Sequence, residues 1–238
     1  HTVTVNVTTV NDAPQGANNS VTALEDTAYA FATVDFGFAD PSDTPANNLL
    51  AVLITTLPGA GSLTDNGVAV TAGQFVSAVD IAAGKLLYTA AADANGVGYD
   101  AFTFQVQDDG GTLNGGVDLD PTPRNMSIDV TPVNDAPQGS NNAVTTLEDT
   151  PYVFVAGDFG FSDPKDLPAD ALQAVKITTL PGVGTLTDNG VAVSAGDFVS
   201  AADIAGGLLV FTPVANANGA GYASFTFQVQ DDGGTANG

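Results

Sequence analysis

The stretch Ala101-Phe102-Thr103-Phe104-Gln105-Val106-Gln107 alternates between apolar and polar side chains along its whole length. A period of two places Phe102, Phe104 and Val106 on one face, the pattern of a strand with one buried face. Residues 2–7 alternate in the same way. The sequence therefore predicts a β-sheet protein whose strands pack one face on a core.

Short apolar runs and turn signals continue this pattern on both sides of the stretch. Asp65-Asn66-Gly67 predicts a tight hairpin, because Asn-Gly tolerates positive φ. Ser77 with Asp80 three residues later predicts one helical turn. No longer stretch has a helical period, and 27 Gly and 13 Pro argue against a helical domain. In the first half of the chain we expect strands at residues 20–24, 28–34, 49–56, 61–70 (a hairpin), 85–89, 101–107 and 125–133.

The whole pattern occurs twice. Asn11-Asp12-Ala13-Pro14 returns as Asn134-Asp135-Ala136-Pro137, an offset of 123 residues (from 11 to 134), and the same offset relates Phe102 to Phe225 without a gap. A long gapless period indicates an array of whole domains rather than a solenoid of repeats of roughly 20–50 residues. Many short strands with turn signals predict an all-β fold of two tandem Greek-key β-sandwich domains, each of about seven strands.

The repeat frame sets the expected domain limits. Residues 1–10 align with residues 124–133, so we expect them to be the last strand of a preceding repeat. The first repeat is expected at 11–133 and the second at 134–238, with its last strand missing. An open sheet edge invites another strand. We therefore expect head-to-tail strand exchange, in which residues 2–10 of one molecule complete the second repeat of another.

Acidic residues dominate the charge. The chain has 27 Asp and Glu against four Lys and Arg, a formal net charge of −23. Nucleic acid and direct membrane contact are not expected, because both need a basic patch. Self-repulsion of this size destabilises a compact fold unless cations offset it. The only histidine is His1 and there is no cysteine, so we do not expect an enzyme.

Acid-rich loops recur at matching places in both repeats, and each precedes or follows a predicted strand. In the first repeat they are residues 24–27, 39–43, 93–96 and 107–111. Together with the Asn-Asp-Ala-Pro linker, the Glu25-Asp26-Thr27 motif and the Asn95-Gly96 to Phe104 stretch, they resemble cadherin-type repeats, most closely the bacterial cadherin-like repeats of giant surface adhesins. The segment 76–88 is also similar to chondroitin sulfate proteoglycan repeats.

This resemblance implies a cadherin- or immunoglobulin-like sandwich and structural extender domains in the stalk of an extracellular, cell-surface adhesin. Calcium ions would sit at the joints between domains and rigidify the array, and the partners would be neighbouring repeats of the same polypeptide. The sequence departs from the family where Ala136 replaces an Asn of the linker and where Asp93-Ala94-Asn95 replaces an Asp-Arg-Glu motif. Fewer carboxylates imply fewer ions per joint.

Calcium (Ca2+) takes roughly six to eight oxygen ligands from carboxylates, amides and backbone carbonyls. Loops at the ends of two sandwiches, with an Asn-Asp linker between them, could supply such a set. For the joint between the repeats we expect Glu25, Asp93, Asn134, Asp135, Asp163, Asp166 and one of Asp231 or Asp232. For the joint before the first repeat we expect Asn11, Asp12, Asp40, Asp43 and one of Asp108 or Asp109.

Simpler interpretations remain open. Asp and Asn are common turn residues, and we assign Asp65 and Asp188 to hairpin turns only. Asp118 and Asp120 are expected to be solvated, and Lys165 is an awkward neighbour for a cation. The alternative function is a calcium-dependent carbohydrate-binding cadherin-like module, whose partner would be a cell-surface or matrix polysaccharide. Tyr99 and Tyr222 are its aromatic candidates.

Overall fold

The computed structural model describes residues 1–235 and divides the chain into two compact units. Unit 1 comprises His1–Pro132, and unit 2 begins at Val133. Strands form several mostly antiparallel sheets and helices are few, which confirms the predicted all-β class. Among the described residues, none of the helices has the length and apolar character needed to cross a bilayer.

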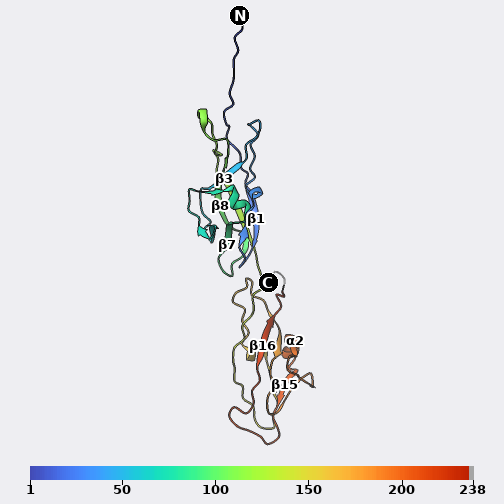
Figure 1. The fold of residues 1–238 in the computed structure, drawn as a ribbon. Helices are drawn as coiled ribbons and strands as arrows, with labels where there is room; N and C mark the ends of the chain where they lie inside the picture. The colour runs from blue at the N-terminus through green and yellow to red at the C-terminus, as the bar shows by residue number, and fades with distance from the viewer. Residues whose placement is uncertain (236–238) are drawn as a thin grey trace. The chain divides into compact units, whose positions relative to one another are not determined.

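Unit 1 contains two sheets (Figure 1). In the five-stranded sheet, β9 lies between β1, to which it is parallel, and β8, to which it is antiparallel. The order of that sheet is β1 (Asn19–Leu24), β9 (Arg124–Thr131), β8 (Gly96–Asp108), β3 (Leu49–Ile54) and β6 (Gln74–Ser77). The order of the four-stranded sheet is β2 (Tyr29–Ala30), β7 (Leu86–Ala90), β4 (Gly61–Asp65) and β5 (Val68–Ala69).

The predicted turns of unit 1 form as expected. Asn66 and Gly67 both have positive φ, which the tight β4–β5 hairpin requires. Helix α1 (Ala78–Ala82) begins at Ser77, whose hydroxyl oxygen accepts a hydrogen bond of 3.0 Å from the Asp80 amide. The helical turn is therefore capped in the predicted way.

The strand predicted at 28–34 is wrong beyond its first residues. Only Tyr29–Ala30 is a strand, and a 3-10 helix, η1 (Thr33–Phe36), follows. The Asp35 carboxylate accepts the Ala32 amide at 2.8 Å, a local bond that competes with sheet pairing. Strand β6 and a second 3-10 turn, η2 (Leu113–Gly115), were not predicted from the sequence.

The core of unit 1 draws on both sheets. Phe102, Phe104 and Val106 are at most 1% exposed, so the face predicted from their alternation is the buried one. Phe104 packs edge-to-face on Phe36 with ring centroids 4.9 Å apart. Strand β9 adds Met126, Ile128 and Val130 to the same core.

Unit 2 repeats this plan with fewer paired strands. One sheet contains β14 (Phe198–Ser200), β11 (Leu172–Ile177) and β16 (Phe227–Asp231). The other contains β10 (Tyr152–Val153), β15 (Leu209–Thr212), β12 (Thr185–Asp188) and β13 (Val191–Ala192). The 3-10 helix η3 (Ala156–Phe159) and helix α2 (Ala201–Ala205) occupy the places of η1 and α1.

The described part of unit 2 contains no counterpart of β9. Residues 142–147, which align with β1, form no strand there. Strand β16 begins at Phe227, although its counterpart β8 begins at Gly96, which aligns with Gly219. Both segments flank β9 in unit 1, and a strand is defined by its hydrogen bonds to a neighbour. The lack of a β9 counterpart among the described residues therefore explains both why residues 142–147 form no strand and why β16 begins late.

Candidate metal centres

Three carboxylates converge at one end of unit 2. Each of Asp163, Asp166 and Asp170 offers a carboxylate oxygen, and these oxygens lie within 4.8 Å of one another. All three belong to the loop between η3 and β11, and we call them the Asp163–Asp166–Asp170 cluster. Asp163 and Asp166 are only 7% and 6% exposed. Carboxylates this close repel one another, so the cluster could hold a metal ion.

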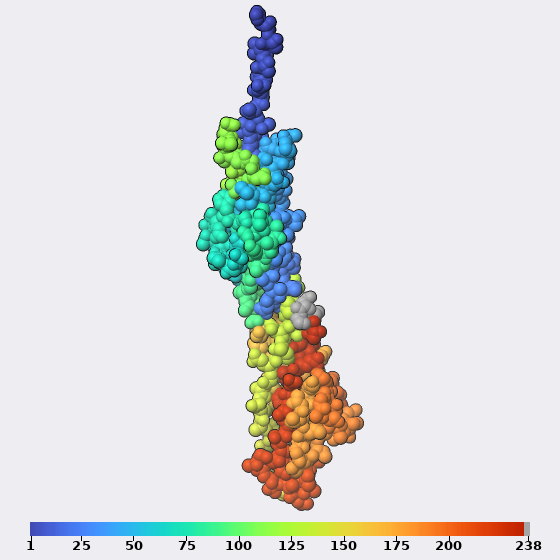
Figure 2. Space-filling model, viewed as in Figure 1, coloured from blue at the N-terminus to red at the C-terminus, as the bar shows by residue number. Residues whose placement is uncertain are grey.

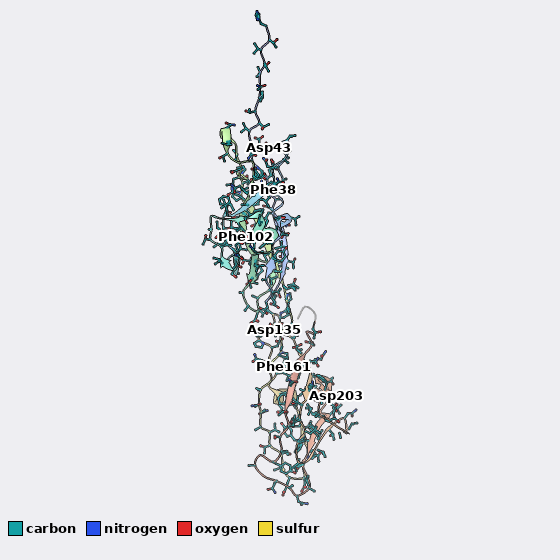
Figure 3. All side chains as sticks on the ribbon, in the orientation of Figure 1. Phe38, Asp43, Phe102, Asp135, Phe161 and Asp203 are labelled. Atoms are coloured by element: carbon teal, nitrogen blue, oxygen red, sulfur yellow. The ribbon has the colours of Figure 1, made fainter. Side chains whose placement is uncertain are left out.

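The linker lies against this cluster. The Asp135 amide donates to both Asp166 oxygens, at 3.2 and 3.1 Å. The Asn134 side-chain amide donates to Asp231 Oδ1 at 3.3 Å. Figure 3 places Asp135 at the end of unit 2, beyond Phe161. The Asn-Asp pair therefore contacts the loop acids of its own unit.

Several oxygens here are buried without a hydrogen-bond donor among the described residues. They are Asn134 Oδ1, Asp135 Oδ2 and Asp163 Oδ1. A buried polar atom that lacks a partner costs free energy. Calcium, a hard cation, coordinates carboxylate and amide oxygens of this kind.

The cluster also changes proton affinities. Burial raises the pKa of Asp166 to about 6, the Asp135 amide lowers it, and the hydrogen bond and charge of Asp163 raise it. Burial likewise raises the pKa of Asp170, and the charges of Asp232 and Asp163 add to this effect. Excess negative charge in a desolvated site therefore favours protons, and a bound cation would relieve the same repulsion.

One cation already stands beside the cluster. The Lys165 ammonium lies 3.4 Å from Asp135 Oδ1, and its side chain is 46% exposed. Lys165 therefore neutralises part of the charge that a metal ion would otherwise meet. Lys165, which the sequence indicated as unfavourable for a cation site, therefore pairs with the candidate ligand Asp135.

Unit 1 has a matching arrangement at its own end, where Figure 3 shows Asp43 beyond Phe38. Asp40 Oδ2 accepts the Asn47 amide at 2.6 Å, and Asp43 Oδ2 accepts the Asp12 amide at 2.9 Å. Asn11 donates to Asp108 Oδ1 at 3.0 Å and accepts a hydrogen bond from the Asn47 side chain. Asp40 Oδ1 and Asp108 Oδ2 are buried, and no described residue donates a hydrogen bond to either atom. Two of the candidate ligands at this end, Asp40 and Asp108, therefore each have a buried oxygen that a cation could coordinate.

Burial and hydrogen bonding distinguish the two members of each adjacent acidic pair, Asp108 with Asp109 and Asp231 with Asp232. Asp108 is fully buried and Asp231 is 5% exposed. Asp109 instead accepts the Asn48 amide at 2.8 Å, and this hydrogen bond lowers its pKa. Asp232 accepts the Ala171 amide at 2.7 Å in the same way. We therefore favour Asp108 and Asp231 as ligand candidates, and Asp109 and Asp232 as turn residues.

The opposite end of unit 1 carries Glu25 and Asp93. Glu25 is 1% exposed, accepts the Asn95 side-chain amide at 3.1 Å and donates its own amide to Thr131 at the end of β9. The Asp93 amide donates to Asp26 Oδ1 at 3.3 Å. Strand β8 has 13 residues, and a rise of about 3.3 Å per residue puts its ends roughly 40 Å apart. Unit 1 is therefore acidic at both ends of its longest strand.

Sequence reasoning missed two neighbours of these sites and misjudged a third residue. Asp170 aligns with Asn47, so the repeat offset could have identified it, and Asp26 is adjacent to Glu25. Asp120 was expected to be solvated, which is wrong. It is 1% exposed and accepts hydrogen bonds from the Gly16 amide and the Arg124 guanidinium at 2.8 and 2.9 Å.

Comparison of the chain with protein-family models, with curated proteins and with solved structures finds no match.

Proposed function

We propose that this chain forms two extender domains in the stalk of an extracellular bacterial adhesin, and that calcium bound at the ends of the units stiffens the stalk. One observation carries the proposal: at their linker ends, both units hold buried oxygens that have no hydrogen-bond donor among residues 1–235. These oxygens are Asp40 Oδ1 and Asp108 Oδ2 in unit 1, and Asn134 Oδ1, Asp135 Oδ2 and Asp163 Oδ1 in unit 2.

The donor set favours calcium among common metal ions. Every candidate ligand is a carboxylate or amide oxygen, the chemistry of hard cations, whereas zinc and copper sites draw on His and Cys. Calcium accepts a variable number of oxygens in irregular geometry, which suits short loops. A formal net charge of −23 also favours divalent cations near the chain.

The repeat gives this chemistry a structural use. We propose that each unit is a Greek-key sandwich, and that its neighbouring repeats are its partners through the Asn-Asp linker. Glu25 and Asp93 at the far end of one unit and the loop acids of the next would then supply one shared set of ligands. Ions held in this way lock the angle between repeats, a mechanical role rather than a catalytic one.

The cation site itself is tested by calcium titration calorimetry on the whole chain. Asp163→Asn with Asp166→Asn should weaken the binding to unit 2 by roughly tenfold or more, because two carboxylates leave the cluster. Asp188→Asn with Asp203→Asn is the matched control, because it also removes two charges. Asp188 also has a buried oxygen without a donor among the described residues, but these two positions lie outside the cluster, at the β12–β13 hairpin and in helix α2. Equal losses in the cluster variant and the control would contradict the site.

The stiffening role is tested by small-angle scattering of the same chain with calcium and with chelator. We expect a longer, better-defined particle with calcium, and an Asp135→Ala variant that scatters in calcium like wild type in chelator. If the wild-type profile does not respond to calcium although calorimetry detects binding, the stalk proposal is wrong and the metal site stands.

The carbohydrate-binding alternative receives less support from its aromatic candidates. The Tyr99 hydroxyl donates to the Ala60 carbonyl at 3.1 Å, and the Tyr222 hydroxyl accepts the Val214 amide at 3.1 Å. Both side chains are half-buried and serve local structure. Calcium-dependent binding of the chain to a glycan array would reverse this preference.

A further inference from the structure

Strand β6 lies at a free edge of unit 1. It is the last strand of the five-stranded sheet, where β3 is its neighbour. Among the described residues, no strand pairs with its other side. Figure 2 shows the teal stretch that contains β6 at the surface, on the flank of unit 1 rather than at either of its ends. An edge strand presents unpaired backbone groups that a further strand can bind.

The backbone of Phe75 faces this free edge. At the first pair of the β3–β6 ladder, the Ile54 carbonyl accepts the Gly73 amide at 2.7 Å. Hydrogen-bonded and non-bonded pairs alternate along an antiparallel ladder. The next pair, Leu53 with Phe75, is therefore non-bonded. The N–H and the C=O of Phe75 consequently point away from β3, toward the side where a further strand would lie.

The edge is apolar and carries no charge. The Phe75 side chain is 47% exposed, and its cross-strand partner Leu53 is half-buried. Residues 68–79, which include β6, contain no charged side chain. In a chain of net charge −23, two copies repel each other wherever acids meet. An uncharged edge of this length is a place where a second copy can approach without that repulsion.

The same edge of unit 2 is charged. Phe198 of β14 stands where unit 1 has Phe75 and is 55% exposed. Lys176 takes the place of Leu53, and its ammonium lies 5.4 Å from the centre of the Phe198 ring. Asp197 takes the place of Gln74. Charges on an edge strand discourage edge-to-edge pairing, so unit 2 has the protection that unit 1 lacks.

The turn before β6 does not require the neutral residue. The Gln74 side-chain oxygen accepts the Thr71 amide at 3.1 Å. In unit 2 the Asp197 carboxylate accepts the Ser194 amide at 2.7 Å, the same hydrogen bond at the repeat offset. Either residue therefore closes the turn, and the two units differ here in the charge of the edge and not in its geometry.

We propose that β6 of one molecule pairs antiparallel with β6 of a second copy, about a two-fold axis at Phe75. Each Phe75 N–H then donates to the C=O of the other Phe75, and the five-stranded sheets of the two molecules become continuous. The two Phe75 rings and the two Leu53 side chains form one apolar strip on the outer face. A two-fold contact uses the same surface on both copies, so association stops at the dimer. The contact is short and belongs to the weak, transient class.

Sedimentation velocity of the full chain in chelator tests the dimer apart from calcium. We expect a monomer–dimer equilibrium that sodium chloride strengthens, because salt screens the repulsion between two acidic chains. Gln74→Asp should weaken association by roughly tenfold or more, since it places like charges near each other across the axis. Thr89→Asp is the matched control: it adds the same charge to an exposed position of β7, in the other sheet.

A second variant transfers the neutral edge to unit 2. Lys176→Leu with Asp197→Gln gives β14 the residues that unit 1 has beside Phe75, and it leaves the net charge unchanged. Each molecule then has two self-pairing edges, so species larger than the dimer should form as the concentration rises. If this variant forms nothing larger than the dimer, the absence of charge does not govern the pairing and the proposal is wrong.

Hydrogen exchange locates the contact. Dimer formation in the wild-type chain should protect the Phe75 amide, which gains an acceptor from the second copy, and should leave the Phe198 amide of unit 2 unprotected. The proposal is also overturned if the wild-type chain stays monomeric at high concentration in sodium chloride. Equal association of Gln74→Asp and Thr89→Asp, or a dimer that does not protect the Phe75 amide, would overturn it as well.

Discussion

At the scale of single residues, the two units differ at two contacting positions whose residues change together. In unit 1 the Tyr88 hydroxyl donates to Asp100 at 3.0 Å, and Asp100 also accepts the amides of Gly59 and Ala60. At the repeat offset, Phe211 and Ala223 take the places of Tyr88 and Asp100. The hydroxyl and the carboxylate are therefore both present in unit 1 and both absent in unit 2.

This difference predicts a non-additive effect of mutation. Asp100→Ala should destabilise unit 1 by roughly 2–3 kcal/mol, because it leaves the buried Tyr88 hydroxyl without its acceptor. Adding Tyr88→Phe should recover about 1 kcal/mol of that loss, since it removes the stranded hydroxyl. Native-state hydrogen exchange of β7 and β8 amides measures both variants. Additive losses would show that the two groups are energetically independent.

Asp166 gives a pH dependence with a defined sign. Burial raises its pKa from 3.8 to about 6, so folded unit 2 binds a proton more tightly than the unfolded chain. Folding stability in chelator should therefore fall as pH rises from about 4 to about 6, and stay at its lower value above that range. Thermal unfolding at pH 5 and pH 7 measures the slope. Asp166→Asn should flatten it, and an unchanged slope would assign the effect to other carboxylates.

At the scale of elements, the loop before β11 shows what one substitution does to a site. Lys165 stands where unit 1 has Ser42, and its ammonium pairs with Asp135. Lys165→Ser should tighten calcium binding to unit 2 by roughly two- to fivefold, the range expected when a half-exposed ion pair worth up to about 1 kcal/mol stops competing. Lys176→Ser, which removes the same charge near the far end of β11, should leave the affinity unchanged. Calcium titration calorimetry on both variants measures these affinities, and equal changes in the two would contradict the prediction.

The elements also show how far sequence reasoning reaches. Alternation identified the β8 core face, and Asn66-Gly67 and Ser77 identified a hairpin and a capped helix, because each signal is local. The end of the 28–34 strand was missed because the Asp35 carboxylate captures the Ala32 amide, a competition that alternation does not register. The burial of Asp120 depends on Gly16, which lies 104 residues away. The choice of Asp108 over Asp109 likewise required the fold, since adjacent acids look alike in sequence.

At the scale of the whole molecule, charge and binding sites make different predictions for the same salt. A chain of net charge −23 gains stability from any added ions through screening. Ions that bind the native state alone add RT ln(1 + [L]/Kd), about 2.7 kcal/mol at a hundredfold excess over Kd. Millimolar calcium should therefore raise the melting temperature more than sodium chloride of equal ionic strength does.

The extra rise in melting temperature that calcium gives over sodium chloride should depend on the ligand residues and not on the total charge of the chain. The Asp163→Asn and Asp166→Asn double variant should lose most of the calcium-specific stabilisation of unit 2, although its lower net charge reduces self-repulsion. Asp188→Asn with Asp203→Asn changes the net charge equally outside the cluster and should keep the calcium response. If calcium and sodium chloride shift the wild-type melting temperature equally, screening alone explains the stabilisation and the acidic ends are not specific cation sites.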